Sequence, residues 1–328
     1  MPSGTKDSSR REVTGRPPEG DMAEQATVKE LLKGAFDTHV HSSPDVLPRK
    51  FDDVMLAKRL IDAGMGGFVL KSHYICTADR ATLLRELFPG VQAFGAITLN
   101  NSVGGLNPIA VDIAGRLGNK VVWLPTVDSA NELENIQGER DESKLPYWMG
   151  IAREMRAKGI AGEWIRVTDD AGKVVEPLRQ CLDVIAQYDM VLATGHISPR
   201  EMLPVVKAAK EAKIGRIIIT HPEFPTTFLS IEQQQELARH DVMFERCFTT
   251  PYTNKVSWEQ VIRNIREVGA STTIMATDLG QTFNPHVDEG LGLYAGKMLD
   301  AGFTENDVVS MVRHNAAQVL GATEKVGV

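Results

Sequence analysis

The histidines of this sequence fall into short motifs whose side chains can bind a metal ion. The clearest is Asp37-Thr38-His39-Val40-His41, where two histidines stand two residues apart at the end of an apolar stretch. Alternate residues of a β-strand point to the same side, so His39 and His41 would project together. Imidazole is the commonest protein ligand for zinc-like ions. By itself this pair is a weak signal, because histidines this close together also occur by chance.

Three further motifs each place one ligand after an apolar run. His196 follows the run MVLAT, His221 follows RIIIT, and Asp278 follows TTIMAT. A lone histidine in such a place can be a hydrogen-bonded loop residue, and a lone aspartate often occupies a turn or a helix cap. The common position of these residues, each at the end of an apolar run, is stronger evidence for a metal site than any single motif, since random placement would scatter the histidines. The sequence therefore predicts a metal site made of His39, His41, His196, His221 and Asp278.

The elements that would position these residues alternate between short β-branched runs and longer amphipathic stretches, which is typical of βαβ units with a parallel sheet. We expect strands over residues 34–40, 67–71, 91–99, 120–124, 190–194, 216–220, 242–246 and 272–277. Such a series predicts a closed (β/α)8 TIM barrel, whose active site lies at the carboxyl ends of the strands. The last strand lies beside the first in such a barrel, so Asp278 would face His39 and His41.

Helix start signals follow several of these strands. Asp52 is expected to cap a helix that ends at Gly64, and three serines precede a Glu or Gln by three residues, which is the pattern of a capping box: Ser198, Ser230 and Ser257. The charged segment from about 128 to 172, between strands four and five, breaks the alternation. We interpret it as an insertion over the barrel mouth, either part of a lid or a solvent-exposed excursion.

The composition excludes several classes of protein. The 328 residues are 42% hydrophobic and 24% charged, which suits a globular chain. The net charge of −7 and the lack of a basic stripe predict no nucleic-acid partner. No apolar run approaches the ~18 residues of a membrane helix, so no membrane partner is expected. The three scattered cysteines predict neither a disulfide framework nor a metal knuckle, and they fit a cytoplasmic location.

The sequence divides into two parts. Residues 1–30 are a polar extension without the apolar core of a signal peptide, and residues 31–328 are expected to form one (β/α)8 metal-dependent hydrolase domain. The extension is either a mobile tail or an arm that packs on a neighbouring subunit. A homo-oligomer therefore stays an open alternative.

Taken together, the HxH pair of strand one, the histidines of strands five and six and the aspartate of strand eight resemble the amidohydrolase superfamily. The resemblance runs from about residue 35 to the end of the chain, where LDAGFT (299–304) and NAAQVLG (315–321) support it. More narrowly, DTHVHSSPD (37–45), LKSH (70–73) and GGLNP (104–108) resemble an uncharacterised bacterial branch of that superfamily. This branch implies a fold and a metal site, not a substrate.

The resemblance implies an enzyme that holds one or two divalent ions, zinc first, with manganese, iron or cobalt as alternatives. A bound metal lowers the pKa of water to about 7 in the best cases. Asp278 would accept the proton of this metal-activated water and pass it to the leaving group. The expected reaction is cleavage of a C–N or C–O bond (amide, lactam, lactone or ester) of a small-molecule substrate, with phosphoester hydrolysis as a lesser alternative. Rival hypotheses are a metal-dependent decarboxylase or C–C lyase, and a non-catalytic barrel that binds a metal or ligand.

The sequence departs from the pattern of the superfamily at strand four. That strand ends WLPT, without the bridging lysine or glutamate of many dinuclear members, whereas strand two ends with Lys71. A carbamylated Lys71 would join the metal ligands; alternatively Lys71 binds a substrate carboxylate or pairs with an acid. His73 and His286 are expected to contact substrate. Glu223, Glu245 and Arg246 lie near the same mouth, and no firm role is assigned to them.

Overall fold

The computed structural model describes residues 28–136, 148–160 and 162–323 of the chain. Most of the predicted N-terminal extension, over residues 1–27, therefore lies outside the described residues, and so does part of the predicted insertion. The division into an extension and one domain stays a prediction.

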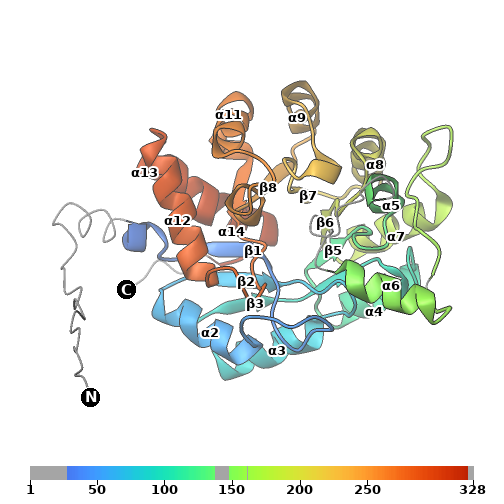
Figure 1. Ribbon diagram of the computed structural model, residues 1–328, viewed down its shortest axis with the longest axis horizontal. Coiled ribbons are helices and arrows are strands. Elements are labelled where there is room, and N and C mark those ends of the chain that lie inside the picture. The colour runs from blue at the N-terminus through green and yellow to red at the C-terminus, as the bar shows by residue number, and fades with distance from the viewer. Residues whose placement is uncertain (1–27, 137–147, 161, 324–328) are drawn as a thin grey trace, which may run out of the picture.

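Parallel strands form the centre of the molecule, surrounded by helices (Figure 1). The strands are β1 (Phe36–Val40), β2 (Gly67–Leu70), β3 (Gln92–Phe94), β4 (Ala96–Thr98), β5 (Val121–Trp123), β6 (Val191–Ala193), β7 (Ile217–Thr220), β8 (Met243–Cys247) and β9 (Thr273–Ala276). They pair in chain order as a sheet of 3 strands, β1 to β3, and a sheet of 6 strands, β4 to β9. Each predicted strand is present, and the prediction for residues 91–99 covers both β3 and β4.

The two sheets join into one (β/α)8 barrel. On one side, Gly95 alone separates β3 from β4, and a Cβ there would lie 2.5 Å from the Cα of Ala78. On the other side, backbone hydrogen bonds connect β1 to the end of β9: Asp278 N to His39 O at 2.9 Å, and His41 N to Leu279 O at 2.8 Å. The predicted TIM-barrel fold is confirmed. The closing bonds join the residues predicted to hold the metal.

Apolar side chains fill the barrel below the site. Phe36, Val69, Val121 and Ile274 belong to one buried cluster that also includes residues of α14 (Asn315–Leu320). Helix α14 lies at the opposite end of the barrel from the predicted site, because Asn315 Nδ2 donates to the carbonyl of Thr273 at 2.7 Å, at the start of β9. The filled interior is a packed core rather than a pore, as is usual in these barrels.

Helices cover the outside of the barrel. Their bounds are α2 (Asp53–Asp62), α3 (Ala78–Leu87), α4 (Pro108–Arg116), α5 (Ala130–Ile136), α6 (Met149–Ala157), α7 (Glu176–Gln187), α8 (Pro199–Glu211), α9 (Ile231–Ala238), α10 (Thr249–Tyr252), α11 (Trp258–Val268), α12 (Val287–Asp300) and α13 (Glu305–Val309). Asp52 caps α2, as predicted, by accepting from Met55 N at 2.7 Å. Ser198 and Ser230 begin capping boxes at α8 and α9, whereas Ser257 caps α11 through its own side chain. Across the described ranges, none of the helices has the length and apolar character needed to cross a membrane.

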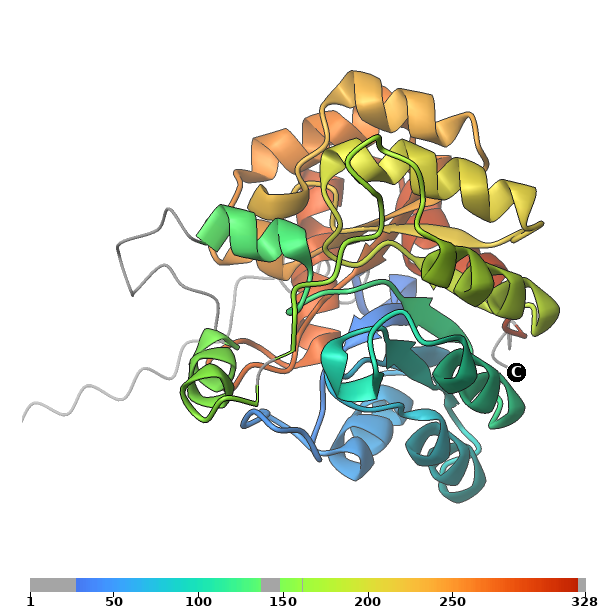
Figure 2. The same cartoon turned by 90° about the vertical axis from the view of Figure 1, so that its right-hand side faces the viewer.

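The predicted insertion lies between β5 and α7, as expected. Its described part contains α5 and α6, which lie at one end of the barrel (Figure 2). An isolated bridge between Ser129 and Ile165 ties its ends together, and a second, between Thr168 and Val174, closes a short turn at its C-terminal end. Trp148, just before α6, is buried and lines the cavity at the barrel mouth. The insertion therefore forms one wall of that cavity.

Gly280 allows the chain after β9 to pass very close to β1. Its φ is +142°, and a Cβ at this position would overlap the carbonyl oxygen of His41. We expect Gly280→Ala to lower the free energy of unfolding by about 3 kcal/mol, because both the backbone conformation and the overlap are unfavourable for alanine. Urea unfolding of this variant and of Gly215→Ala, where no atom lies within 4 Å of the added Cβ, checks the prediction. Equal stability of the two variants would contradict it.

Candidate active site

A cavity of about 350 Å³ opens at the carboxyl ends of the strands. Its lining includes most of the predicted site: His41, Lys71, His73, His196, His221 and Asp278. His39 lies beneath this lining and is fully buried. The structure thus brings together at one place residues that are as much as 239 positions apart, since the site runs from residue 39 to residue 278.

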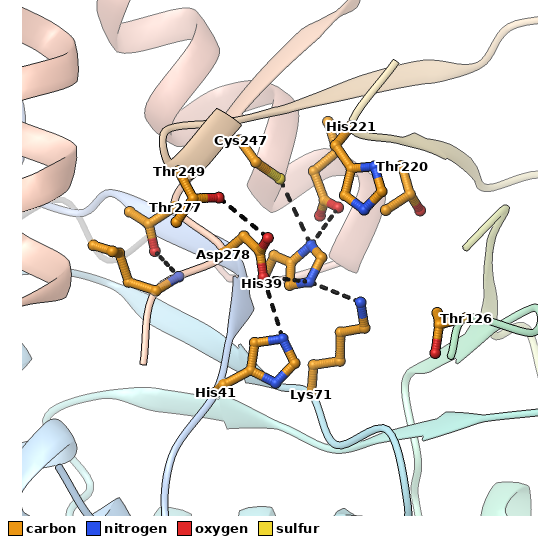
Figure 3. Close-up of polar contacts among 12 residues, drawn as sticks. His39, His41, Lys71, Thr126, Thr220, His221, Cys247, Thr249, Thr277 and Asp278 are labelled. Carbon is orange, nitrogen blue, oxygen red and sulfur yellow. Dashed lines mark hydrogen bonds and ion pairs between the residues drawn. The ribbon is translucent and has the colours of Figure 1, made fainter. Parts of the chain in front are cut away.

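One half of the site comes from β1 and the end of β9. Figure 3 shows His39, His41 and Asp278 turned toward one another. Asp278 Oδ1 lies 3.2 Å from Nε2 of both histidines, and its Oδ2 accepts from Thr249 Oγ1 at 3.1 Å. The pairing register of β1 shifts between Asp37 and Val40, which is the sign of a bulge. Bulges often re-aim side chains next to active sites.

The other half comes from the ends of β6 and β7. Nε2 of His196 and Nε2 of His221 are 3.2 Å apart. The rings of His39 and His221 are stacked across the site with centroids 6.1 Å apart. His221 has a φ of +27° and Asp278 a φ of +54°, values that non-glycine residues seldom adopt. Such conformations persist only where the surroundings impose them, and they cluster at functional sites.

Lys71 extends from the end of β2 into the centre of the histidine cluster. Its Nζ lies 2.9 Å from His39 Nε2 (Figure 3). It also lies 5.2 Å from the centre of the Trp123 ring. The side chain is buried, and burial lowers the pKa of Lys71. A buried amine with a lowered pKa is more often neutral, and a neutral amine can act as a nucleophile or as a ligand.

The Nδ1 atoms of four histidines lie next to polar side chains behind the rings, on the side away from the centre of the site. Nδ1 of His39 lies 2.9 Å from Glu245 Oε2, Nδ1 of His221 lies 3.2 Å from Thr227 Oγ1, and Nδ1 of His73 lies 2.8 Å from Thr126 Oγ1. Nδ1 of His196 is 2.8 Å from Glu132 Oε1, although the angle is not that of a hydrogen bond. This arrangement leaves Nε2 of His39, His196 and His221 directed at the centre, as in metal sites where the second nitrogen of each imidazole is held by a polar group.

Burial dominates the electrostatics of the site. It lowers the pKa of His41, His73 and His221 well below the usual range, so these rings are neutral near pH 7. Burial would raise the pKa of Asp278, but the neighbouring imidazoles and Lys71 outweigh it and hold that pKa well below its usual range. Neutral imidazoles beside an ionised carboxylate are the protonation states that bind a metal ion.

The donor set fits a divalent metal ion. His39, His41 and Asp278 place one ligand atom each within 4.8 Å of one another. Two imidazole nitrogens at 3.2 Å, as in His196 and His221, need a shared proton or a shared cation between them. Imidazole and carboxylate ligands suit zinc, manganese, iron or cobalt.

The other predicted site residues have different places. His73 lines the cavity, and its ring stacks on His41 with centroids 4.9 Å apart. His286 is the residue before α12, where it stacks on Phe51, and it is not among the described residues that line the cavity. Glu223 and Arg246 form a buried ion pair with each other, and Arg246 also donates to Gln234 at 2.9 Å, outside the cavity lining.

Three further residues belong to the site: Glu245, which the sequence placed near the mouth without a firm role, and Cys247 and Arg49, which were not singled out from the sequence. Glu245 is fully buried and accepts from Thr38 Oγ1 at 2.5 Å as well as facing His39. Cys247 Sγ lies 3.7 Å from Nδ1 of the same histidine (Figure 3). Arg49 lines the cavity and lies 3.3 Å from His41. Alternation along β8 places Glu245 and Cys247 on the inner face, and this signal was available in the sequence.

The barrel, with histidine and aspartate side chains gathered at its strand ends, has the fold of the amidohydrolase superfamily. The sequence profile described as "Family of unknown function (DUF6282)" matches residues 34–245, and the chain belongs to this family. A search of curated proteins found none with significant sequence similarity to the chain.

Solved structures share the fold at low sequence identity. An amidohydrolase from Pseudomonas aeruginosa is 10% identical with a TM-score of 0.60, over 90% of this chain and 98% of that one. The probable dipeptidase PvdM from Pseudomonas aeruginosa is 10% identical with a TM-score of 0.59, over 93% and 98%. A 2,6-dihydroxybenzoate decarboxylase from Rhizobium is 13% identical with a TM-score of 0.50, over 88% and 99%. At these identities the likeness concerns the fold alone.

Proposed function

We propose that this protein is a metal-dependent hydrolase that cleaves a C–N or C–O bond of a small molecule. The observation that carries the proposal is the convergence of four histidines and one aspartate at the ends of β1, β6, β7 and β9: His41, His196, His221 and Asp278 line one cavity, and His39 lies directly beneath them. Amide, lactam, lactone and ester bonds are the candidate targets. The fold similarity to an amidohydrolase and a dipeptidase supports the same class of reaction.

Each residue has a role that follows from its place. A bound divalent ion would supply a more acidic water and would polarise the substrate carbonyl. The four histidines would hold the ion, and their outer partners would keep each ring oriented. Asp278 is ionised and one-fifth exposed to the cavity, so its carboxylate can accept a proton from water and return it to the leaving group. Trp148 and Phe224 line the cavity and would exclude bulk water around the substrate.

Lys71 decides between a site for one ion and a site for two. Its Nζ lies among the proposed ligands, 2.9 Å from His39 Nε2. Reaction of the neutral amine with carbon dioxide would form an N–C bond, release one proton and give a carbamate that can bridge two ions. If the lysine stays unmodified, it is free to bind a carboxylate of the substrate. Intact-mass measurement, which detects the added carbon dioxide, and metal content together distinguish these cases.

The test is the metal content of protein purified without added metal, for wild type and for the double variant His39→Ala/His41→Ala. We expect about one or two equivalents per chain in the wild type and most of this metal to be lost in the variant. His240→Ala is the matched control, because His240 follows α9 and does not line the cavity. A wild type that holds no metal and cannot be loaded would overturn the proposal. Analysis of the products then separates hydrolysis, which consumes water, from decarboxylation, which releases carbon dioxide.

A further inference from the structure

The cavity carries positive charge beyond what the proposed metal ligands need. Among the described residues that line it, Arg49 and Lys255 are basic in addition to Lys71, and Asp278 is the acidic one. Asp278 is already engaged by His39, His41 and Thr249. Away from the proposed metal ligands, basic side chains in the lining favour a bound group that is negatively charged.

Arg49 is held in a fixed position at the cavity wall. Its side chain is 3% exposed and that of Asp45 is 1% exposed. Asp45 Oδ2 accepts from Arg49 Nε at 2.7 Å and lies 2.6 Å from Nη2. Within the described ranges, the hydrogen bonds of the Arg49 guanidinium use Nε and Nη2 and leave Nη1 for a ligand. A planar guanidinium held on one edge by a carboxylate can present its other edge to a second carboxylate.

The contact between Arg49 and His41 depends on the tautomer of the histidine. A guanidinium only donates, so the 3.3 Å approach of Nη2 to His41 Nδ1 requires this nitrogen to accept. When His41 uses its Nε2 lone pair for a metal, its proton lies on Nδ1, and the contact with Arg49 is lost. The Nη2 donor of Arg49 then also becomes available to a ligand in the cavity.

Lys255 provides a second cation in the lining of the cavity. Its Nζ lies 4.6 Å from the centre of the Phe224 ring, and Phe224 contacts His221 with ring centroids 5.0 Å apart. Across the described residues, Lys255 forms no ion pair, although it lines the cavity. Leu47, Trp148 and Phe283 add apolar surface to the same cavity. The cavity walls therefore combine apolar contact surface with two cationic side chains, Arg49 and Lys255.

We propose that the substrate is a small organic acid with an apolar body, whose carboxylate is bound by Arg49 and Lys255 while its reacting bond faces the histidine cluster. This inference rests on the proposed function and specifies its substrate class. The apolar body would lie against Trp148 and Phe224. Arg49 contributes a preoriented donor edge, and Lys255 contributes a flexible charge at the rim.

The experiment compares 3-phenylpropionate with 3-phenylpropionamide, which have nearly the same size and differ in charge. Binding is measured by isothermal titration calorimetry on wild type, Arg49→Met, Lys255→Met and, as a matched control, Lys50→Met, since Lys50 does not line the cavity. We expect the wild type and the control to bind the acid at least about 10-fold tighter than the amide, as charge-assisted hydrogen bonds typically give. Each cavity variant should lose most of this preference while retaining its metal content.

Three results would overturn the inference. The first is equal binding, or no binding, of the acid and the amide by the wild type. The second is a preference for the acid that survives in both cavity variants. The third is such a preference that disappears only in His39→Ala/His41→Ala, since the metal alone would then bind the carboxylate. If Arg49→Met fails to fold, Arg49→Lys and Lys255→Met decide the matter. Metal content is measured on the same samples, so failure of the metal site is seen separately.

Discussion

Asp278→Asn is expected to lower kcat by at least about 100-fold on any substrate that the wild type hydrolyses, because the variant loses the proposed proton acceptor. Asparagine has nearly the same shape, and its side-chain oxygen can still accept from Thr249 and face His39 and His41. We therefore expect the fold and ligand binding to survive. The measurement is kcat and KM after the metal content of the variant has been brought to that of the wild type.

The control for this prediction is Asp288→Asn. Asp288 pairs with Arg59 on the outside of the barrel, at 2.5 Å, so the same chemical change there should leave kcat unaltered. Retention of wild-type kcat in Asp278→Asn would contradict the assignment of Asp278 as the acid-base residue. A protein that binds its ligand normally and shows no turnover even as wild type would instead support the non-catalytic barrel.

The positions of the metal-ligand candidates were predictable because parallel strands with crossover helices have few possible arrangements. Once β1, β6, β7 and β9 are recognised, the carboxyl ends of all four must meet at one end of a barrel. His196 and His221 each follow such an end directly, and the structure places their Nε2 atoms 3.2 Å apart. The closeness of Asp278 to the β1 histidines likewise follows from closure, which requires the last strand to lie beside the first.

The residues around the histidine cluster that come from loops and from the insertion could not be placed from the sequence, because no periodic pattern of residues indicates how a loop folds. Arg49 lies in the loop between β1 and α2, and its direction depends on the hydrogen bonds from its guanidinium to Asp45. Glu132 reaches His196 from α5, a helix of the insertion. His286 was expected at the cavity because it follows β9. It is instead the N-cap residue of α12, and its backbone N–H donates to Glu289 at 3.0 Å. Loop conformation, rather than the order of strands, decides each of these positions.

Closure of the barrel and orientation of the site use the same residues. Asp37 is fully buried, and it accepts from Thr277 Oγ1 at 2.5 Å and from the backbone N–H of Thr277 at 3.1 Å. It also accepts from His39 N at 3.0 Å. Asp37 therefore fixes the backbone of β1 against that of β9 immediately before the proposed metal ligands of each strand. A change that loosens this junction should disturb the proposed metal site before it unfolds the barrel.

Glu245 links the ring of His39 to the interior of the barrel. Both carboxylate oxygens are occupied: Oε1 accepts from Thr38 at 2.5 Å, and Oε2 faces His39 Nδ1 at 2.9 Å. A carboxylate behind a ligating imidazole fixes the ring and makes its other nitrogen a better donor to a metal. Residue 245 is fully buried, so water cannot replace the carboxylate if it is removed.

We expect Glu245→Gln to weaken metal binding by about 10- to 100-fold, since glutamine keeps the shape and loses the charge. Glu245→Ala should also lower the Tm, because Thr38 and His39 would be left buried without their partner. Competition with a chelator measures the affinity, and thermal unfolding of the metal-free protein measures the stability. Glu223→Gln is the control, because Glu223 pairs with Arg246 away from the cavity and should affect stability alone. An unchanged metal affinity in Glu245→Gln would show that the buried carboxylate serves only to hold β8 against β1, and that His39 does not need it to bind the ion.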